Sequence, residues 1–194
     1  MSANRELDDL LHDRFNITTT DFVAALKRLP ALRPWATSLT EDEARLLDDA
    51  DFAEDHDAHV AAATEVAGQM ASLTVTAFTA KEVAVGLGVT AARVRQKRLA
   101  GELWAISDGP RWIFPVMQFE TNAHGVPTRQ VRGLDQVFKA LPAGLHPVAI
   151  AGFLSTPQAD LLRSRALTPV EWLRAGGDID AAVAAAANVD WYTA

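Results

Sequence analysis

Four basic side chains lie within six consecutive positions of this 194-residue chain, at Arg93, Arg95, Lys97 and Arg98. Guanidinium and ammonium groups at this density suit contacts with nucleic-acid phosphates and base edges. Residues 79–132 hold eight Lys and Arg against four Asp and Glu, a net charge of +4, whereas the whole chain carries −7. Because salt screens charges beyond about 8–10 Å, DNA responds mainly to this local surplus. The basic segment therefore predicts binding to double-stranded DNA.

Two short helices joined by a tight turn are predicted to carry these side chains. Thr79 and Glu82 have the spacing of a capping box, which begins a helix. Gly88 stands where a left-handed residue would end that helix, and Thr90 is suited to cap the next one. The apolar residues of the first helix are Val83, Ala84 and Leu87. This pattern is typical of a helix-turn-helix, whose second helix enters the major groove.

The residues that follow the basic helix predict a β-hairpin. Residues 103–106 and 111–114 are short runs of mostly apolar residues on either side of the turn-forming segment 107–110. Pro115 is expected to end the second strand or to leave it at the edge of its sheet. A hairpin directly after a DNA-binding helix is a wing, and Arg111 near its tip is placed to contact a phosphate.

Residues 73–119, through the stretch KEVAVGLGVTAARVRQKRLAGELWAI, resemble the winged helix-turn-helix of the excisionase and MerR-like families. The resemblance implies a base-facing set at the start of the second helix: Thr90, Ala91, Ala92, Arg93, Arg95 and Gln96. Two of these are alanines, which implies few base-specific contacts. The families have apolar residues where Lys97 and Arg98 stand, so either the stems of these two cover the core or the helix turns differently. The predicted DNA-binding set also includes Lys97, Arg98 and Arg111.

Two other interpretations of the basic helix compete with DNA binding. Basic residues often form only the solvated face of a helix, and an isolated helix-turn-helix pattern has many false positives. Small winged helices also serve as protein-interaction modules. The basic cluster, the caps and the hairpin together favour nucleic-acid binding over both interpretations.

A second motif-bearing segment is residues 153–187, FLSTPQADLLRSRALTPVEWLRAGGDIDAAVAAAA. Within it, Thr168, Pro169 and Glu171 predict a helix start, with an N-cap threonine, a proline at the first position and a glutamate at the third. The segment resembles the toxin-binding domain of the Xre/MbcA/ParS-type antitoxins. The matching residues are Phe153, Leu154, Pro157, Leu161, Leu162, Thr168, Pro169, Trp172, Leu173, Gly176 and Val183.

This second resemblance implies a partner protein. Members of the family are antitoxins of RES-domain toxins, which consume NAD⁺; the antitoxin covers the toxin's active-site cleft and represses its own operon. The typical member has an Xre-like helical DNA-binding domain, whereas residues 73–119 predict a winged one. An orphan regulator with the same C-terminal bundle is therefore a second interpretation. A helical bundle that only closes the core or forms a homodimer is a third.

Two aromatic residues near the end of the chain, Trp191 and Tyr192, are candidate partner-binding residues. Aromatic anchors are enriched at protein interfaces, which favours this role. The same two side chains are equally suited to packing back on their own domain.

The sequence predicts a mostly α protein in four parts. Residues 1–72 form an acidic helical N-terminal region, and residues 73–119 form the winged helix-turn-helix with its short β-hairpin. Residues 120–132 are polar and predict a linker, and residues 133–194 form a helical toxin-binding-like domain. The N-terminal helices are too short to be stable alone, so we expect them to pack on another part of the chain or on a second copy in a homodimer.

Composition excludes several classes of protein. The chain has no cysteine, which excludes disulfides and thiolate metal sites. With no membrane-spanning run and no signal peptide, we expect a cytoplasmic protein that does not bind membranes. His56 and His59 have the spacing of a helical metal pair but lack a third ligand, so no metal is expected. Because the chain has no catalytic motif and no glycine-rich phosphate loop, we expect neither enzymatic activity nor a cofactor.

These observations predict a DNA-binding, antitoxin-like transcriptional repressor. It would bind its operator through the winged helix-turn-helix and a RES-type toxin through the C-terminal domain. One alternative is a stand-alone winged-helix regulator with helical dimerisation regions. The other is a protein-interaction adaptor that does not bind DNA.

Overall fold

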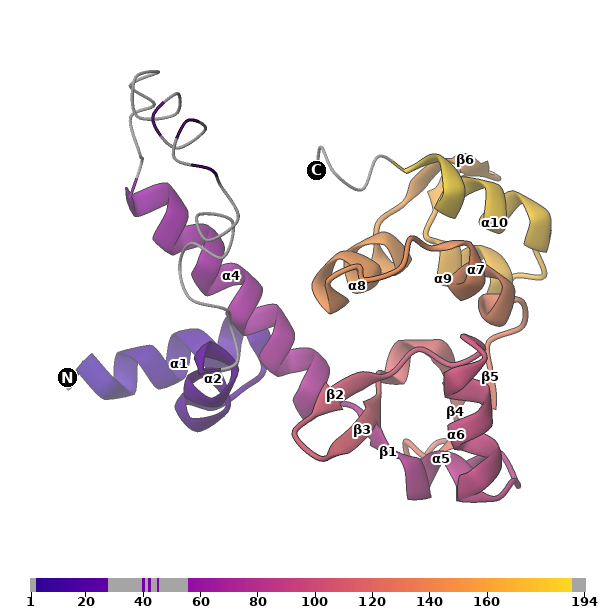
Figure 1. The fold of residues 1–194 in the computed structure, drawn as a ribbon, viewed down its shortest axis with the longest axis horizontal. Helices are drawn as coiled ribbons and strands as arrows, with labels where there is room; N and C mark the ends of the chain where they lie inside the picture. The colour runs from indigo at the N-terminus through magenta and orange to yellow at the C-terminus, as the bar shows by residue number, and fades with distance from the viewer. Residues whose placement is uncertain (1–2, 28–39, 41, 43–44, 46–55, 190–194) are drawn as a thin grey trace. The chain divides into compact units, whose positions relative to one another are not determined.

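Helices predominate in the computed structural model, which describes residues 3–27, 40, 42, 45 and 56–189 (Figure 1). Small antiparallel sheets supply the other regular structure. The helix-dominated fold class predicted from the sequence is therefore confirmed. Contacts between Cα atoms divide the chain into two units, residues 1–75 and 76–194. Among the described helices, none is both long enough and apolar enough to cross a membrane.

In the N-terminal unit, the described elements are α1 (Ala3–Phe15), α2 (Thr19–Leu26) and α4 (His56–Val75). A capping box between Thr18 and Asp21 begins α2. The buried core of this unit is small and consists of Leu11, Ile17, Phe22, Ala25, Ala67 and Ala71. Small side chains on α4 allow close packing, and the ring of Phe15 occupies the position that a Cβ on Gly68 would need.

The predicted helix-turn-helix segment forms two helices, α5 (Ala80–Gly86) and α6 (Ala91–Leu99). The capping box at the start of α5 is present: the Thr79 amide donates to Glu82 Oε2 at 2.7 Å, and the Glu82 amide donates to Thr79 Oγ1 at 3.3 Å. Gly88 follows the C-cap of α5 with a φ of +63°, the left-handed conformation that glycine adopts without strain. The local signals in the sequence therefore placed the turn correctly.

The predicted hairpin is also present and belongs to a three-stranded sheet. Its strands are β2 (Ile106–Asp108) and β3 (Arg111–Phe114), with Ile106 opposite Ile113. A third strand, β1 (Phe78–Thr79), pairs with β3 in the order β1-β3-β2. The sequence did not predict β1, because two residues cannot display an alternating pattern. The core under the helices and sheet consists of Val83, Ala84, Val94, Leu103, Phe114 and Phe119.

Residues 120–132, expected as a linker, contain a second hairpin, so that expectation was wrong. Strand β4 (Phe119–Thr121) pairs with β5 (Pro127–Gln130). The side chain of Asn122 closes the turn by accepting hydrogen bonds from the amides of His124 and Val126, at 2.9 and 3.0 Å. Polar, turn-forming residues indicated a loop, and they do form one, but the tight turn also brings the flanking residues into register.

Arg174 connects this second hairpin to the C-terminal helices. Its guanidinium donates to the Phe119 carbonyl at 3.0 Å and to the Glu120 carboxylate at 3.2 Å. A charge-assisted contact therefore binds the hairpin to the end of α9 (Pro169–Arg174), so the hairpin packs on the C-terminal helices.

Gln118 is the buried polar residue at the centre of this unit. It lies in the short 3₁₀ helix η1 (Val116–Gln118), and its side chain is fully buried. Its Oε1 accepts from the Trp104 amide at 3.0 Å, and its Nε2 donates to the Trp104 carbonyl at 2.7 Å and the Pro115 carbonyl at 3.2 Å. Its own carbonyl accepts from the Val131 amide at 2.9 Å. One residue thus joins the segment after α6 to the ends of both hairpins.

The other C-terminal helices are α7 (Leu134–Ala140), α8 (Pro147–Ser155) and α10 (Ile179–Asn188). Figure 1 shows α7, α9 and α10 together, and α10 packs on both of the others. The predicted start of α9 is confirmed, because Thr168 accepts from the Glu171 amide at 3.1 Å and Pro169 is the first helical residue. The residues most buried here are Leu134, Val137, Phe153, Leu154, Leu161, Leu173, Ala182, Ala185 and Ala186.

The C-terminal region was expected to be a helical domain, but it also contains a hairpin that the sequence analysis did not predict. Strands β6 (Gln158–Leu162) and β7 (Ala166–Leu167) form a hairpin, with Leu162 opposite Ala166. Leu161 is fully buried whereas Leu162 is 62% exposed, which is the alternation of a strand. Because the two leucines are adjacent, the sequence shows no alternation of apolar and polar residues here, and the pair resembles part of the apolar stripe of a helix.

Replacing Gln118 with leucine should destabilise the fold by about 2–4 kcal/mol, because the buried N–H and C=O of Trp104 would lose their partners. Gln136→Leu is the matched control. Gln136 is exposed on α7, so its loss should change the free energy of unfolding by less than about 0.5 kcal/mol. Urea denaturation measures both. Equal effects of the two substitutions would contradict the role given to Gln118.

Gly86→Ala should destabilise the protein by about 1–3 kcal/mol, because overpacking displaces the neighbouring backbone. A Cβ at this position would lie 1.9 Å from the carbonyl oxygen of Pro127, so α5 and β5 would have to separate. Gly152→Ala in α8 is the control, since Gly152 is exposed with nothing near its Cβ position. Alanine there should stabilise the helix by up to about 1 kcal/mol. Thermal unfolding distinguishes the two signs, and a stabilising Gly86→Ala would contradict the packing.

Candidate nucleic-acid interface

Helix α6 has one buried residue, Val94, with exposed basic side chains immediately before and after it. Thr90 is its N-cap and accepts a hydrogen bond from the Arg93 amide at 3.2 Å. Val94 is fully buried and holds the helix on the core. The residues exposed around the first turns are Thr90, Ala91, Ala92, Arg93, Arg95 and Gln96. The six residues of the predicted base-facing set are therefore all exposed around the start of the helix, and their contact with DNA stays a prediction.

Arg93 and Arg95 differ in their present partners. The Arg93 guanidinium donates to Gln96 Oε1 at 3.3 Å, one turn further along α6. Arg95 has no hydrogen bond or ion pair with any residue that the structure describes. Both are exposed, and the small side chains of Ala91 and Ala92 leave room beside them. These guanidinium groups are available to an external anion.

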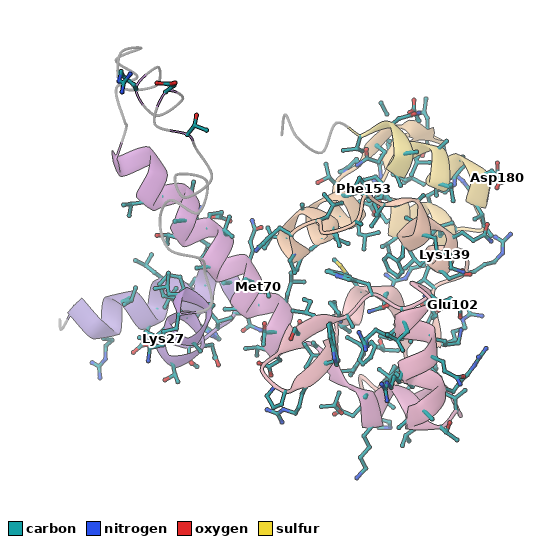
Figure 2. All side chains as sticks on the ribbon, in the orientation of Figure 1. Lys27, Met70, Glu102, Lys139, Phe153 and Asp180 are labelled. Atoms are coloured by element: carbon teal, nitrogen blue, oxygen red, sulfur yellow. The ribbon has the colours of Figure 1, made fainter. Side chains whose placement is uncertain are left out.

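Lys97 is engaged within the protein. Its ammonium forms an ion pair with Glu102 at 2.9 Å, and both side chains are only 26% exposed. Glu102 also lies 4.0 Å from the ammonium of Lys139 on α7, and Figure 2 labels both residues. The hydrogen bond from Lys97 lowers the pKa of Glu102 below its ordinary value, which keeps the carboxylate charged. Glu102 therefore lies between an ammonium group of α6 and one of α7.

Arg98 is also part-buried. Its guanidinium carbon lies 3.9 Å from the centre of the Trp112 ring on β3, a close cation–π contact. Lys97 and Arg98 are both half-buried, and each charged end has a partner within the protein. Sequence reasoning missed Trp112. Its position in a strand next to Arg111 carried no signal of its contact with a helix 14 residues earlier.

Arg111 lies at the start of β3, beside the turn of the first hairpin. Its side chain is 76% exposed and its guanidinium is 3.9 Å from the carboxylate of Asp108. An ion pair this long and exposed contributes little stability, so the guanidinium can exchange this partner for a phosphate.

A groove of about 590 Å³ lies on the other side of α5, next to the turn of the β4–β5 hairpin. It is lined by Phe78, Thr79, Lys81, Glu82, Val85, His124, Gly125, Val126 and Pro127. Glu82 is held by the capping box and its pKa is lowered by the hydrogen bonds from Thr79. Within this lining the Thr79 hydroxyl donates to Glu82 Oε2 at 2.8 Å.

Some predicted residues fall outside the description. Trp191 and Tyr192 are outside the described residues, and so are the side chains of His56 and His59. The partner-binding role of the two aromatic residues therefore stays a prediction. In the part of the chain that is described, no three His, Asp or Glu side chains form a group that could hold a metal ion.

Glu171, in the motif of the C-terminal segment, accepts three hydrogen bonds from two residues. Its carboxylate accepts from the Arg165 guanidinium at 2.8 and 3.3 Å and from the Thr168 amide at 3.0 Å. The hydrogen bond from Arg165 is the largest cause that lowers the pKa of Glu171 from 4.5 to about 2. The charged form therefore stabilises the native state, and the same residue caps α9 and fixes the β6–β7 turn.

This pKa shift predicts an acid-dependent loss of stability. Because the folded-state pKa lies below the unfolded one, the contribution of Glu171 is present above pH 4.5 and is lost as the pH falls toward 2. Glu171→Gln should therefore reduce the pH dependence of the free energy of unfolding in this window. Arg165→Gln removes the main partner and should have the same effect. Profiles parallel to wild type in both variants would contradict the assignment.

Comparison with known proteins offers no relative on which to base a function. No family model, no curated protein and no solved structure matched the chain.

Proposed function

We propose that this protein binds double-stranded DNA through a winged helix-turn-helix made of α5, α6 and the β2–β3 hairpin, and that it acts as a transcriptional repressor. The observation that carries the proposal is the exposure of two arginines on α6, Arg93 and Arg95, immediately before and after the buried Val94. Neither guanidinium forms an ion pair with a carboxylate among the described residues. A helix with such a surface fits the major groove, where arginine binds guanine bidentately.

Affinity in this proposal comes mainly from phosphate contacts. Ala91 and Ala92 occupy two of the exposed positions near the helix start, and alanine reads little beyond the methyl group of thymine. Arg95 and Gln96 are the side chains best suited to base edges, and Arg111 is suited to the backbone. The adaptor alternative predicts a different salt dependence. A module that binds only proteins should not show the steep loss of DNA affinity with salt that counterion release produces.

A toxin partner for the C-terminal segment stays a proposal that rests on the sequence resemblance. Several of the matched residues are core residues of the fold, including Phe153, Leu154, Leu161 and Leu173. Such positions would be apolar in any protein that folds this way, whether or not it has a partner. The exposed matched residues, such as Leu162, are the ones that a partner could contact. Homodimer formation stays a prediction in the same sense.

Replacing Arg95 with alanine should weaken DNA binding. The expected loss is about 1–3 kcal/mol if Arg95 contacts a base, and a contact to phosphate would instead reduce the salt slope of log K by about 0.9. Fluorescence anisotropy with a labelled duplex at several salt concentrations measures both quantities. Arg5→Ala is the matched control, since it removes the same charge from an exposed position of α1 in the other unit.

Two outcomes of that experiment would count against the proposal. If Arg95→Ala and Arg93→Ala both retain wild-type affinity and salt slope, α6 is not the DNA-binding helix. If wild-type protein shows no salt-dependent binding to any duplex, the adaptor alternative replaces DNA binding.

A further inference from the structure

The contact between Arg98 and Trp112 joins the basic helix to the first hairpin. Arg98 lies in the last turn of α6 and Trp112 in β3, and the guanidinium carbon is 3.9 Å from the ring centre. The Trp112 side chain remains 42% exposed, so the pair is at the surface and not in the core. Core packing alone therefore does not account for a tryptophan at this position.

The partners of the neighbouring cations set Arg98 apart. Lys97 is paired with Glu102 at 2.9 Å, and Arg111 has Asp108 at 3.9 Å. The Arg98 guanidinium has neither a hydrogen bond nor an ion pair with any residue in the described part of the chain; its contact is with a neutral ring. An arginine stacked on an aromatic face keeps its N–H donors in the plane of the guanidinium, pointing away from the ring.

This geometry prepares the side chain for an anion. A free arginine loses much of its rotamer freedom when it binds a phosphate, whereas stacking on Trp112 imposes part of that order beforehand. The planar fork also matches the geometry of a phosphate group. When α6 occupies a major groove, the region between the helix and the wing lies next to the phosphate backbone, which is where this pair is found.

We propose that Arg98 binds a backbone phosphate of DNA and that Trp112 is the positioning residue that holds Arg98 in the binding orientation. This inference rests on the proposed function and adds to it a second class of contact. Arg95 and Gln96 face base edges, while the Arg98–Trp112 pair fixes the register of the helix on the backbone without reading sequence.

Four variants test the pair by fluorescence anisotropy with a random-sequence duplex across a range of salt concentrations. Arg98→Gln should reduce the salt slope by about 0.9, the value for one phosphate contact. Trp112→Leu keeps the charge, so it should leave the slope unchanged and weaken binding by about threefold to tenfold. Trp112→Phe should retain most of the affinity, because it keeps an aromatic face.

The double variant Arg98→Gln/Trp112→Leu should bind no more weakly than Arg98→Gln alone.

The double variant distinguishes positioning from simple support of the fold. If Trp112 only stabilises the hairpin, its loss will add to that of Arg98→Gln, and the proposal is overturned. An unchanged salt slope in Arg98→Gln also overturns it. Should that occur while Arg95→Ala still weakens binding, DNA binding by α6 stands and only the Arg98 contact fails. Absence of salt-dependent binding by wild-type protein overturns both. Thermal unfolding of each variant ensures that the compared proteins are folded.

Discussion

The buried side chain of Gln118 is the contact on which the C-terminal unit depends. Its amide group satisfies both backbone groups of Trp104, the residue that leads from α6 into the first hairpin. Its backbone carbonyl receives the Val131 amide at the end of the second hairpin. The Trp104 ring in turn lies 6.3 Å from that of Phe138 on α7. A buried amide without hydrogen-bond partners lowers the stability of the folded state. We therefore expect the segments that Gln118 joins to fold together.

The basic residues of α6 divide into two groups that differ in their contacts within the protein. Lys97 and Arg98 lie where the helix meets the rest of the unit, and their partners are Glu102 and Trp112. Arg93 and Arg95 are exposed and contact no other element among the described residues. A cluster that appears uniform in the sequence therefore divides into two residues held by contacts beyond the helix and two that are not. The division follows from the helical period, since residues three or four positions from Val94 share its buried side.

Local signals in the sequence predicted local structure well. Thr79 with Glu82, Gly88 and Thr90 placed both helices and their turn, because caps depend on residues within four positions. The missed strands depend on distant partners. β1 needs β3, and the second hairpin packs on α5 through the close approach of Gly86 to Pro127. The exposed set at the start of α6 was predictable from the capped helix, whereas the Arg98–Trp112 contact was not, because it joins two elements through tertiary packing.

The most direct test of the account is amide NMR of the full-length, ¹⁵N-labelled protein titrated with a short duplex at low salt. If α6 enters the groove and the first hairpin contacts the backbone, the shifts should change most at residues 90–98 and 108–112, and little in α10. Perturbations confined to other elements, or none at a concentration where binding is saturated, would contradict the account.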